Sequence, residues 1–353
     1  MSKFINPRLG RLETYVPGEQ PKDQQYIKLN TNELPYPPSP EVIARVNAAQ
    51  VADLRLYSDP TCGGLVEKLA RQYDVAPENV FVGNGSDEVL NFAFACYCRA
   101  GAAFADLTYG FYGVFAELYG IDADIKPLRD DFSIDPADYM NVGKAVVIAN
   151  PNAPTGLVLP VETIEAIVRS NPDHVVIIDE AYVDFGATSV VPLTKKYENL
   201  LVASTFSKSR ALAGARVGFG IGNEALIRDL NRIKFTTNPY NINRLSLVAA
   251  EAALDSQAYF DEKDRLVAQT RASATAALRA LGFETTDSMA NFIFAKSDRI
   301  GGGDLYRQLK ARGILVRHFD TARIKDFVRI TVGTPAEMDA LLGAINDILN
   351  SLD

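Results

Sequence analysis

A series of short apolar segments, each ending in polar residues, restricts the chain to few possible folds. The segments are NVFVGNGS (79–86), AAFADLTY (102–109), AVVIANPN (145–152), HVVIIDEAY (174–182) and LLVASTFS (200–207). Their apolar residues do not alternate with polar ones, which is typical of strands buried on both faces of a sheet. Helical patterns separate several of them, for example at 160–172. The sequence therefore predicts an α/β fold with a mostly parallel sheet sandwiched by helices.

Four polar clusters follow these segments, at 84–88, 150–155, 179–182 and 204–208. The carboxyl ends of parallel strands meet at one edge of a sheet, and α/β proteins bind their ligands there. We therefore expect the four clusters to lie close together and to form a single site.

The chain changes character near residue 256. Its length of 353 residues suggests about two domains. A long amphipathic pattern at 261–281 leads into further apolar segments at 291–297, 313–319 and 327–334, and the first thirty residues are polar and rich in Pro and Gly. We divide the chain into an N-terminal arm (1–30), a large domain (31–255) and a smaller α+β domain (256–353), which the arm is expected to join.

The composition argues against several classes of protein. A net charge of −8 repels nucleic acid, so a small molecule is the expected partner. His174 and His318 are the only histidines, which disfavours a Ser-His-Asp hydrolase or a histidine-rich metal site. Three cysteines fit the reducing cytoplasm, and no apolar run approaches the length of a membrane span.

Lys208 stands in an otherwise small and apolar segment, STFSKSRALAGARVGFG (204–220). A lysine whose stem packs while its ammonium group reaches water would explain this position. The functional alternative is a desolvated amine whose lowered pKa allows it to form a Schiff base. Thr205, Ser207 and Arg216 would then bind a phosphate. The cofactor that is both a phosphate and an aldehyde is pyridoxal phosphate.

The other clusters have structural explanations of their own. Asp179 caps a strand end or, with Tyr182, holds a cationic ring. GNGSDE (83–88) is a capped helix start, the simpler explanation in isolation, or a cradle of backbone amides for phosphate. Pro154 is a candidate for a cis peptide bond in a tight turn.

Two arginines stand in apolar segments of the smaller domain. Arg317 and Arg329 are either exposed edge-strand residues or clamps for carboxylate and phosphate. Their occurrence in adjacent segments suggests a doubly anionic substrate.

Taken in order, these motifs resemble the fold-type I aminotransferases that depend on pyridoxal phosphate. The matching segments are LETYVPGE (12–19), KLNTNELPYPPSP (28–40), LYSDP (56–60), NGSDEVL (84–90), NPNAPTG (150–156), IIDEAYVDF (177–185), TFSKSRALAGARVGF (205–219), MANFIF (289–294), GILVRHF (313–319) and VRITVGT (328–334). The combination of NGSDEVL with VRITVGT favours the histidinol-phosphate aminotransferase group within this family.

The resemblance implies a role for each matching residue. Lys208 would bind the cofactor covalently and move a proton, Asp179 would pair with the pyridinium nitrogen, and Tyr182 would bind the ring hydroxyl. The other assignments are Ser86, Asp87, Thr205, Ser207 and Arg216 for the phosphate, Tyr109 for stacking on the ring, Asn152 as a candidate for the ring hydroxyl, Tyr57 for the phosphate in the neighbouring subunit of a homodimer, and Tyr15, Asn32, Arg317 and Arg329 for the substrate.

The implied reaction is transamination between L-histidinol phosphate and 2-oxoglutarate, in cytoplasmic histidine biosynthesis. Three alternatives stay open: an aromatic-amino-acid aminotransferase, a threonine-phosphate decarboxylase and a cofactor-binding regulator without turnover. The chain departs from the family pattern in two places. Ala153 replaces a common asparagine, and Ser209 and Arg210 replace the small or aromatic residues usual after the lysine. Neither departure predicts a different reaction.

Overall fold

The structure is a computed structural model that describes Ile5, Leu9, Leu12 and residues 15–352. Most of the first half of the predicted arm, including Glu13 and Thr14 of the LETYVPGE motif, therefore lies outside the described residues.

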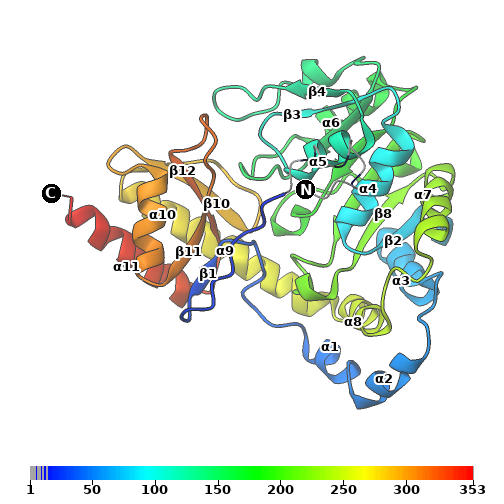
Figure 1. Cartoon of the computed structure of the whole chain (residues 1–353), viewed down its shortest axis with the longest axis horizontal. Coiled ribbons are helices and arrows are strands. Elements are labelled where there is room, and N and C mark those ends of the chain that lie inside the picture. The colour runs from blue at the N-terminus through cyan, green and yellow to red at the C-terminus, as the bar shows by residue number, and fades with distance from the viewer. Residues whose placement is uncertain (1–4, 6–8, 10–11, 13–14, 353) are drawn as a thin grey trace.

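The larger sheet has seven strands in the order β2–β8–β7–β6–β5–β3–β4 (Figure 1). They are β2 (Val80–Gly83), β3 (Ala102–Ala105), β4 (Ala123–Lys126), β5 (Ala145–Ala149), β6 (Val176–Asp179), β7 (Leu200–Thr205) and β8 (Gly218–Gly222). Strands β4, β3, β5, β6 and β7 are parallel, and β8 is antiparallel to both β7 and β2. The predicted α/β fold is confirmed, and β2, β5, β6 and β7 all end at the same edge.

Helices cover both faces of this sheet. They are α3 (Gly63–Tyr73), α4 (Ser86–Tyr97), α5 (Phe111–Tyr119), α6 (Val161–Ser170), α7 (Glu224–Thr237) and α8 (Arg244–Asp255). Successive residues of a strand point to opposite faces. Ile178 accordingly packs in the core with α3, α6 and α8, whereas Ile177 packs in the core with α4, α5 and α7. Burial on both faces explains why the strand segments read as continuous apolar runs.

The smaller sheet has the strand order β1–β11–β12–β10–β9. Its strands are β1 (Ile27–Leu29), β9 (Phe283–Thr285), β10 (Phe292–Ser297), β11 (Ile314–His318) and β12 (Phe327–Thr331), and its helices are α9 (Gln257–Ala280), α10 (Gly302–Ala311) and α11 (Pro335–Asn350). Strand β1 pairs in parallel with β11, so a segment near the N-terminus completes a sheet built from the C-terminal part of the chain.

Short helices lie in the connections. They are α1 (Pro40–Arg45), α2 (Ala48–Ala52) and the 3₁₀ turns η2 (Asp53–Arg55), η3 (Pro77–Asn79), η4 (Pro136–Tyr139), η5 (Val183–Phe185), η6 (Val191–Lys195) and η7 (Ala213–Ala215). None of the helices within the described residues has the length and apolar character needed to cross a membrane.

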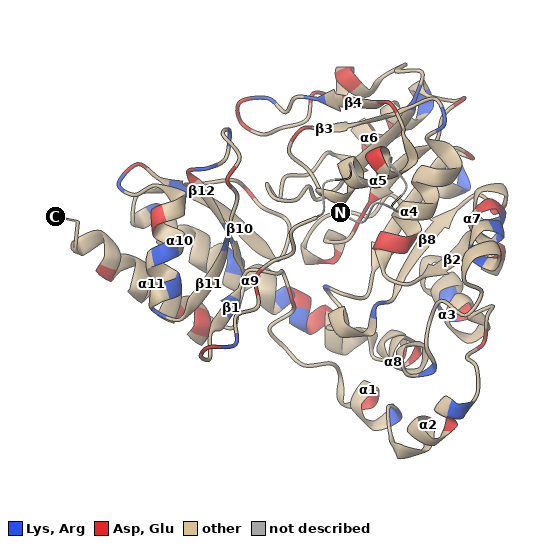
Figure 2. Cartoon of the chain, viewed as in Figure 1, with Lys and Arg blue, Asp and Glu red and all other residues tan. Residues whose placement is uncertain are grey.

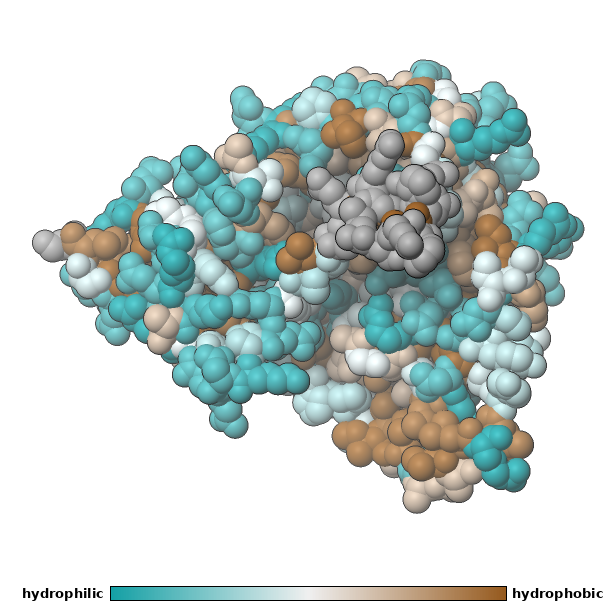
Figure 3. Space-filling view, viewed as in Figure 1, coloured by the Kyte–Doolittle hydropathy of each residue, from teal (hydrophilic) through white to brown (hydrophobic). Residues whose placement is uncertain are grey.

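Charge and apolar character are distributed differently over the surface. Acidic and basic residues are interspersed along both parts of the chain (Figure 2). Apolar side chains instead gather around α1 and α2, in a patch that we define as Ile43, Val51, Leu54, Leu56 and Tyr57 (Figure 3). Tyr57 is 80% exposed and its ring stacks on that of Tyr240, with ring centroids 4.5 Å apart. An exposed apolar patch of this kind marks a surface that another molecule covers.

Gly218 allows β8 to pass directly under the start of α4. A Cβ atom at this position would lie 2.2 Å from the backbone nitrogen of Ser86. Gly218→Ala is therefore expected to destabilise the protein by about 1–3 kcal/mol, because neither backbone segment can move without disturbing the sheet. Gly113→Ala is the matched control, since a Cβ there meets nothing within 4 Å. At this exposed position of helix α5 the substitution should raise stability by about 0.5–1 kcal/mol. Thermal unfolding measures both, and equal midpoints for the two variants would contradict the prediction.

Candidate active site

The strand ends of the larger sheet bring the predicted clusters around one cavity of about 140 Å³. Asp179 stands at the end of β6, Thr205 at the end of β7, and Ser86 begins α4 after β2. The predicted residues that line the cavity are Ser86, Asp87, Tyr109, Asp179, Tyr182, Thr205, Ser207, Lys208 and Arg216. The convergence expected from the strand pattern is therefore present.

The start of α4 forms one wall of this cavity and suits an anion. Its N-cap is Gly85, which has no side chain to accept from the first free N–H groups of the helix. Unpaired N–H groups and the helix dipole together favour a phosphate at such a position. A Cβ at Gly85 would lie 2.6 Å from Nη2 of Arg216, so the glycine makes room for the guanidinium group.

Arg216 is held at this wall by polar groups from two other segments. Its Nη2 donates to Oδ2 of Asp87 at 2.9 Å, and its Nη1 lies 3.5 Å from Oγ of Ser207. Its backbone is in the left-handed region, with φ 54°. The hydroxyl of Thr205 donates to Ser207 at 2.9 Å, so two hydroxyl groups and a guanidinium group lie within reach of one anion.

Asp179 is a buried carboxylate at the floor of the cavity. Its Oδ2 accepts from the hydroxyl of Tyr112 at 2.8 Å, and its Oδ1 accepts from the backbone N–H of Ala181 at 3.1 Å. Burial raises the pKa of Asp179 to about 6, although both hydrogen bonds oppose the shift. A carboxylate so desolvated is stabilised strongly by a cation placed beside it.

Tyr109 contacts both the floor of the cavity and the wall formed by the start of α4. Its hydroxyl donates to Oδ1 of Asp87 at 2.7 Å, and burial raises its pKa well above the usual value for tyrosine. Its ring packs edge-on against Tyr112, with centroids 5.7 Å apart. The side chain of Asp87 thus accepts from Tyr109 and Arg216 together, whereas the sequence suggested only a contribution from its backbone.

Lys208 projects between the first cavity and a second one of about 700 Å³. Its Nζ donates to the carbonyl oxygen of Thr31 at 3.3 Å and lies 5.6 Å from the ring centroid of Tyr182. The hydroxyl of Tyr182 accepts from Nδ2 of Asn32 at 3.0 Å. Asn32 is buried with φ 56°, and it is fixed by bonds to Thr331 and Asn291.

The second cavity is bordered by the two predicted arginines. Arg317 and Arg329 are directly opposite each other on β11 and β12. Arg317 donates to the carbonyl oxygens of Val16 and Pro17, and Arg329 donates to that of Asn30. Like charges directly opposite on a sheet repel each other, so an anion between them would be strongly stabilised.

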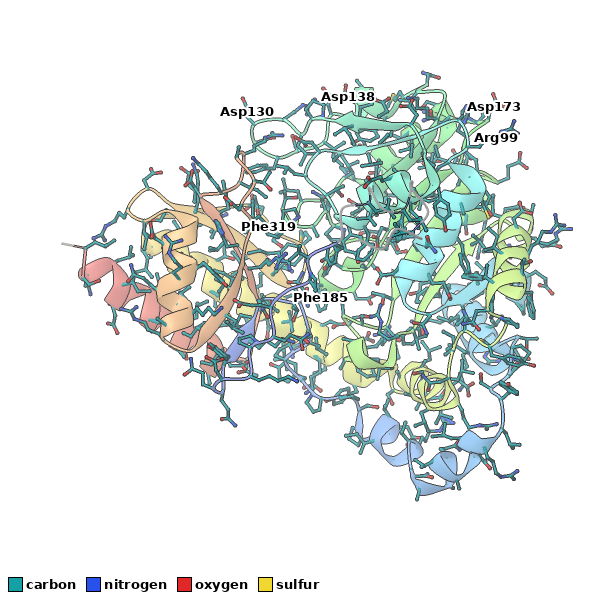
Figure 4. The ribbon with its side chains drawn as sticks, in the orientation of Figure 1. Arg99, Asp130, Asp138, Asp173, Phe185 and Phe319 are labelled. Carbon is teal, nitrogen blue, oxygen red and sulfur yellow. The ribbon has the colours of Figure 1, made fainter. Side chains whose placement is uncertain are left out.

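Burial also affects the ionisation of the groups around this cavity. Burial lowers the pKa of Arg329, and Nε of this side chain is buried without a hydrogen-bond partner. Its guanidinium carbon lies 5.6 Å from the ring centroid of Phe319, which is labelled between the two domains in Figure 4. Tyr15 borders the same cavity, with its ring 4.4 Å from that of Phe111, and burial raises its pKa.

Two predicted residues lie outside both cavities. The amide of Asn152 is occupied by Thr108, Leu107 and Thr155, at 2.8 to 3.1 Å, and its neighbour Ala153 borders the cavities instead. The Ala153–Pro154 peptide bond is cis, as the turn motif suggested. Tyr57 lies in the exposed patch at α1 and α2, and it contributes nothing to the site of its own chain.

Three residues of the site carried no sequence signal that we recognised. Tyr112 reaches Asp179 from α5, the carbonyl oxygen of Thr31 accepts from Lys208, and Thr331 donates to Oδ1 of Asn32 at 3.0 Å. Tyr112 and Thr331 lie in apolar stretches that read as core, and only tertiary contacts reveal their polar roles.

A family model described as "Aminotransferase class I and II" matches residues 24–345, so the chain belongs to this family. Among curated relatives, it is 50% identical to Histidinol-phosphate aminotransferase 1 of Bordetella parapertussis, over 99% of this chain and 100% of that protein. It is 47% identical to the Histidinol-phosphate aminotransferase of Brachyspira hyodysenteriae, again over 99% and 100% of the two chains. Family membership predicted from the motifs is therefore confirmed.

A solved structure supports the fold independently. The histidinol-phosphate aminotransferase of Sinorhizobium meliloti, solved in complex with pyridoxal-5′-phosphate, superposes with a TM-score of 0.88 and 23% identity. The superposition covers 100% of this chain and 99% of that one. At this identity the likeness establishes the shared fold.

The buried carboxylate of Asp179 predicts a pH-dependent stability for the cofactor-free protein. Its folded-state pKa of about 6 exceeds the ordinary value of 3.8, so its contribution to stability is lost as the pH rises through this interval. Asp179→Asn cannot ionise, so relative to the parent protein it should gain up to about 3 kcal/mol between about pH 4 and pH 7. Denaturant unfolding across this range measures the difference.

Two comparisons make this measurement specific. Glu180, whose pKa burial raises to about 7, is present in both proteins, and Asp179 is the smallest of the causes given for its shift, so most of its contribution cancels in the difference. Asp173→Asn removes an exposed carboxylate just before β6, labelled at the outer surface in Figure 4, and should leave the pH dependence unchanged. A pH-independent difference between Asp179→Asn and the parent protein would contradict the prediction.

Proposed function

We infer that the chain is a pyridoxal-phosphate-dependent aminotransferase that interconverts L-histidinol phosphate and imidazole acetol phosphate with 2-oxoglutarate and glutamate, in histidine biosynthesis. The observation that carries this inference is the position of Lys208. Its amine lies between a small cavity with a buried acid and an anion-binding helix start, and a large cavity with two opposed arginines. The identity of 45–50% to curated histidinol-phosphate aminotransferases over the full chain supports the same reaction.

The residues of the small cavity fit a phosphorylated, cationic ring. The N–H groups at the start of α4, with Arg216, Ser207 and Thr205, would hold the phosphate. The carboxylate of Asp179 lies where a protonated ring nitrogen would neutralise it, and Tyr182 would bind the ring hydroxyl. When bound, pyridoxal phosphate supplies an electron sink for the carbon that loses its proton.

The chain itself supplies the base and the geometry of the reaction. Nζ of Lys208 takes the proton from the substrate and returns it in the other half of the reaction, as a positioned general acid and base. Asp179 would keep a bound ring nitrogen protonated, because a buried carboxylate strongly favours a neighbouring cation. Asn32 holds the hydroxyl of Tyr182, so that the orientation of this ring is fixed before the substrate arrives.

The large cavity accounts for a substrate with two different anionic ends. Arg329 would bind the carboxylate of glutamate in a bidentate manner, and Arg317 with Tyr15 would bind the phosphate of histidinol phosphate. In this structure Arg317 donates to backbone carbonyl oxygens of residues 16 and 17, so an anionic substrate would replace weaker, uncharged acceptors.

The reaction is tested with purified protein, cofactor and a panel of amino donors. We expect a visible absorbance band after cofactor is added, its loss on addition of glutamate, and a higher kcat/KM for histidinol phosphate than for aromatic amino acids. Phosphothreonine should release no carbon dioxide. A protein that develops no visible band, or one that prefers another donor, would contradict this function.

The variant Lys208→Ala gives the sharper test of mechanism. It should retain some cofactor through the phosphate site yet lose turnover by about 10⁴-fold or more, because both covalent and acid–base catalysis depend on this amine. Lys196→Ala serves as the control, since this lysine is exposed and pairs with Glu165 on the surface. Near-normal turnover in Lys208→Ala would overturn the assignment.

We also propose that the active unit is a homodimer in the cytoplasm, with Tyr57 reaching the cofactor phosphate of the partner subunit. The apolar patch at α1 and α2 supports a covering subunit, because exposed apolar side chains gather there around Tyr57. The three cysteines, Cys62, Cys96 and Cys98, are free thiols, which is usual for a reducing compartment.

A heterodimer of two inactive or impaired variants tests this arrangement. Lys208→Ala and Tyr57→Phe are co-expressed with different tags, and the mixed dimer is purified. One of its two sites then combines the intact Lys208 with the intact Tyr57 of the other subunit, so activity should return to about half that of the parent dimer. Activity no higher than that of the Tyr57→Phe homodimer would show that Tyr57 serves its own subunit.

A further inference from the structure

A buried ion pair lies behind the loop that carries Lys208. Arg210, two residues after the lysine, has a side chain only 6% exposed, and so has Asp264 on α9. Their closest atoms, Nη1 of Arg210 and Oδ2 of Asp264, are 4.0 Å apart, which is too far for a hydrogen bond. Nη1 of Arg210 and Oδ1 of Asp264 are both buried without any hydrogen-bond partner. Buried polar atoms are seldom left unpaired, and a buried ion pair is stabilising only with good geometry.

The loop around Arg210 is otherwise held firmly. Nη2 of Arg210 donates to Oε1 of Gln257 at 3.0 Å, and its guanidinium carbon lies 5.5 Å from the ring centroid of Phe260. Ser209, which directly follows the lysine, donates to the carboxylate of Asp184. Ala211 has φ 54°, a left-handed conformation that is strained for a residue with a side chain. The position of Lys208 therefore depends on the contacts that fix residues 209–211.

Helix α9 connects this loop to the smaller domain. Phe260 near its start belongs to the core of the large domain, whereas Val267, Ala274 and Leu278 belong to the core of the small domain. Asp264 lies between these two groups. Further along, Nη1 of Arg271 donates to the carbonyl oxygen of Phe185, at the end of the η5 turn that follows Tyr182. A movement of the small domain therefore reaches Asp264 through a single continuous helix (Figure 1).

We propose that Arg210 and Asp264 are positioning residues: they transmit the approach of the small domain, driven by substrate binding at Arg317 and Arg329, along α9 to the loop that carries Lys208. In the structure the closest atoms of the two side chains are about one ångström farther apart than the atoms of a hydrogen bond. Closure of the domains would bring the two unpaired atoms together and fix the amine beside the substrate. The proposal rests on the proposed function and extends it to Ser209 and Arg210, the departures from the family pattern noted in the sequence.

The ionisation of Asp264 adds a pH dependence to this coupling. Burial, together with Asp184 and Asp261, raises its pKa to about 8 against the opposing effect of Arg210. The groups that face this site are Asp184 and Glu180 around η5, Tyr73 of α3 and Asp261 on α9 itself. A closed ion pair requires the carboxylate, so closure becomes more favourable as the pH rises from about 7 to about 9.

Hydrogen exchange of the holoenzyme measures the coupling without relying on turnover. The probe is glutarate, which has the two carboxylates of glutamate but no amino group. In the parent protein, glutarate should slow amide exchange in residues 206–212 by about fivefold or more, with a larger effect at about pH 9 than at about pH 7. In Asp264→Asn the slowing should fall below about twofold and lose its pH dependence.

Matched variants separate positioning from a general loss of stability. Glu262→Gln removes an exposed carboxylate two residues earlier on the same helix, one that pairs with Lys263, and should keep the full effect. Arg210→Lys retains the charge and should keep part of it. In steady state, Asp264→Asn should lower kcat by about tenfold with less than about threefold change in KM for glutamate, because the substrate still binds the two arginines.

The possible outcomes decide between the two proposals. Full protection of residues 206–212 by glutarate in Asp264→Asn would overturn the positioning role and leave the aminotransferase assignment intact. A parent protein that takes up no cofactor would instead refute the proposed function. Equal loss of protection in Glu262→Gln and Asp264→Asn would assign the effect to the charge of α9 as a whole and would also overturn the specific pair.

Discussion

The buried carboxylate at the end of β6 is the constraint around which the site is built. Asp179 is accommodated by only two hydrogen bonds, from Tyr112 and the N–H of Ala181, so its charge is costly until a cation faces it. The sheet places this acid at the same edge as the N-terminus of α4 and Arg216, which together favour an anion. A ligand that is cationic at one end and anionic at the other satisfies both ends of the cavity.

A second constraint on the site is the pair of arginines that lie opposite each other on two neighbouring strands. Arg317 and Arg329 belong to the small sheet, whereas Lys208 belongs to the large one. In the proposed reaction, binding of the substrate and chemistry on it would therefore reside in different parts of the chain, and these parts would have to keep a fixed relation. The connection through α9 supplies that relation, because a helix with its ends in two cores moves with both of them.

Much of this arrangement was accessible from the sequence, and the exceptions have physical causes. Continuous apolar strands and their polar ends predicted the parallel sheet and the convergence of Asp179, Lys208 and the 84–88 cluster. Strand β8 was not recognised because GFGIG has too few β-branched residues, and its first residue, Gly218, is explained only by the close passage under α4. The side-chain role of Asp87 depends on Tyr109 and Arg216, which are distant in sequence. The spacing of residues also cannot show that the amide of Asn152 is occupied by Leu107, Thr108 and Thr155.

The addition of β1 to the edge of the small sheet has a consequence for how the chain folds during synthesis. Residues 27–29 emerge from the ribosome long before their partner strand at 314–318. The large sheet can assemble as soon as residue 222 is available, since all its strands are contiguous in the chain. The early strand must wait without its partner until residues 314–318 have been synthesised. The order of synthesis therefore favours a folded large domain as the platform on which the small domain closes last.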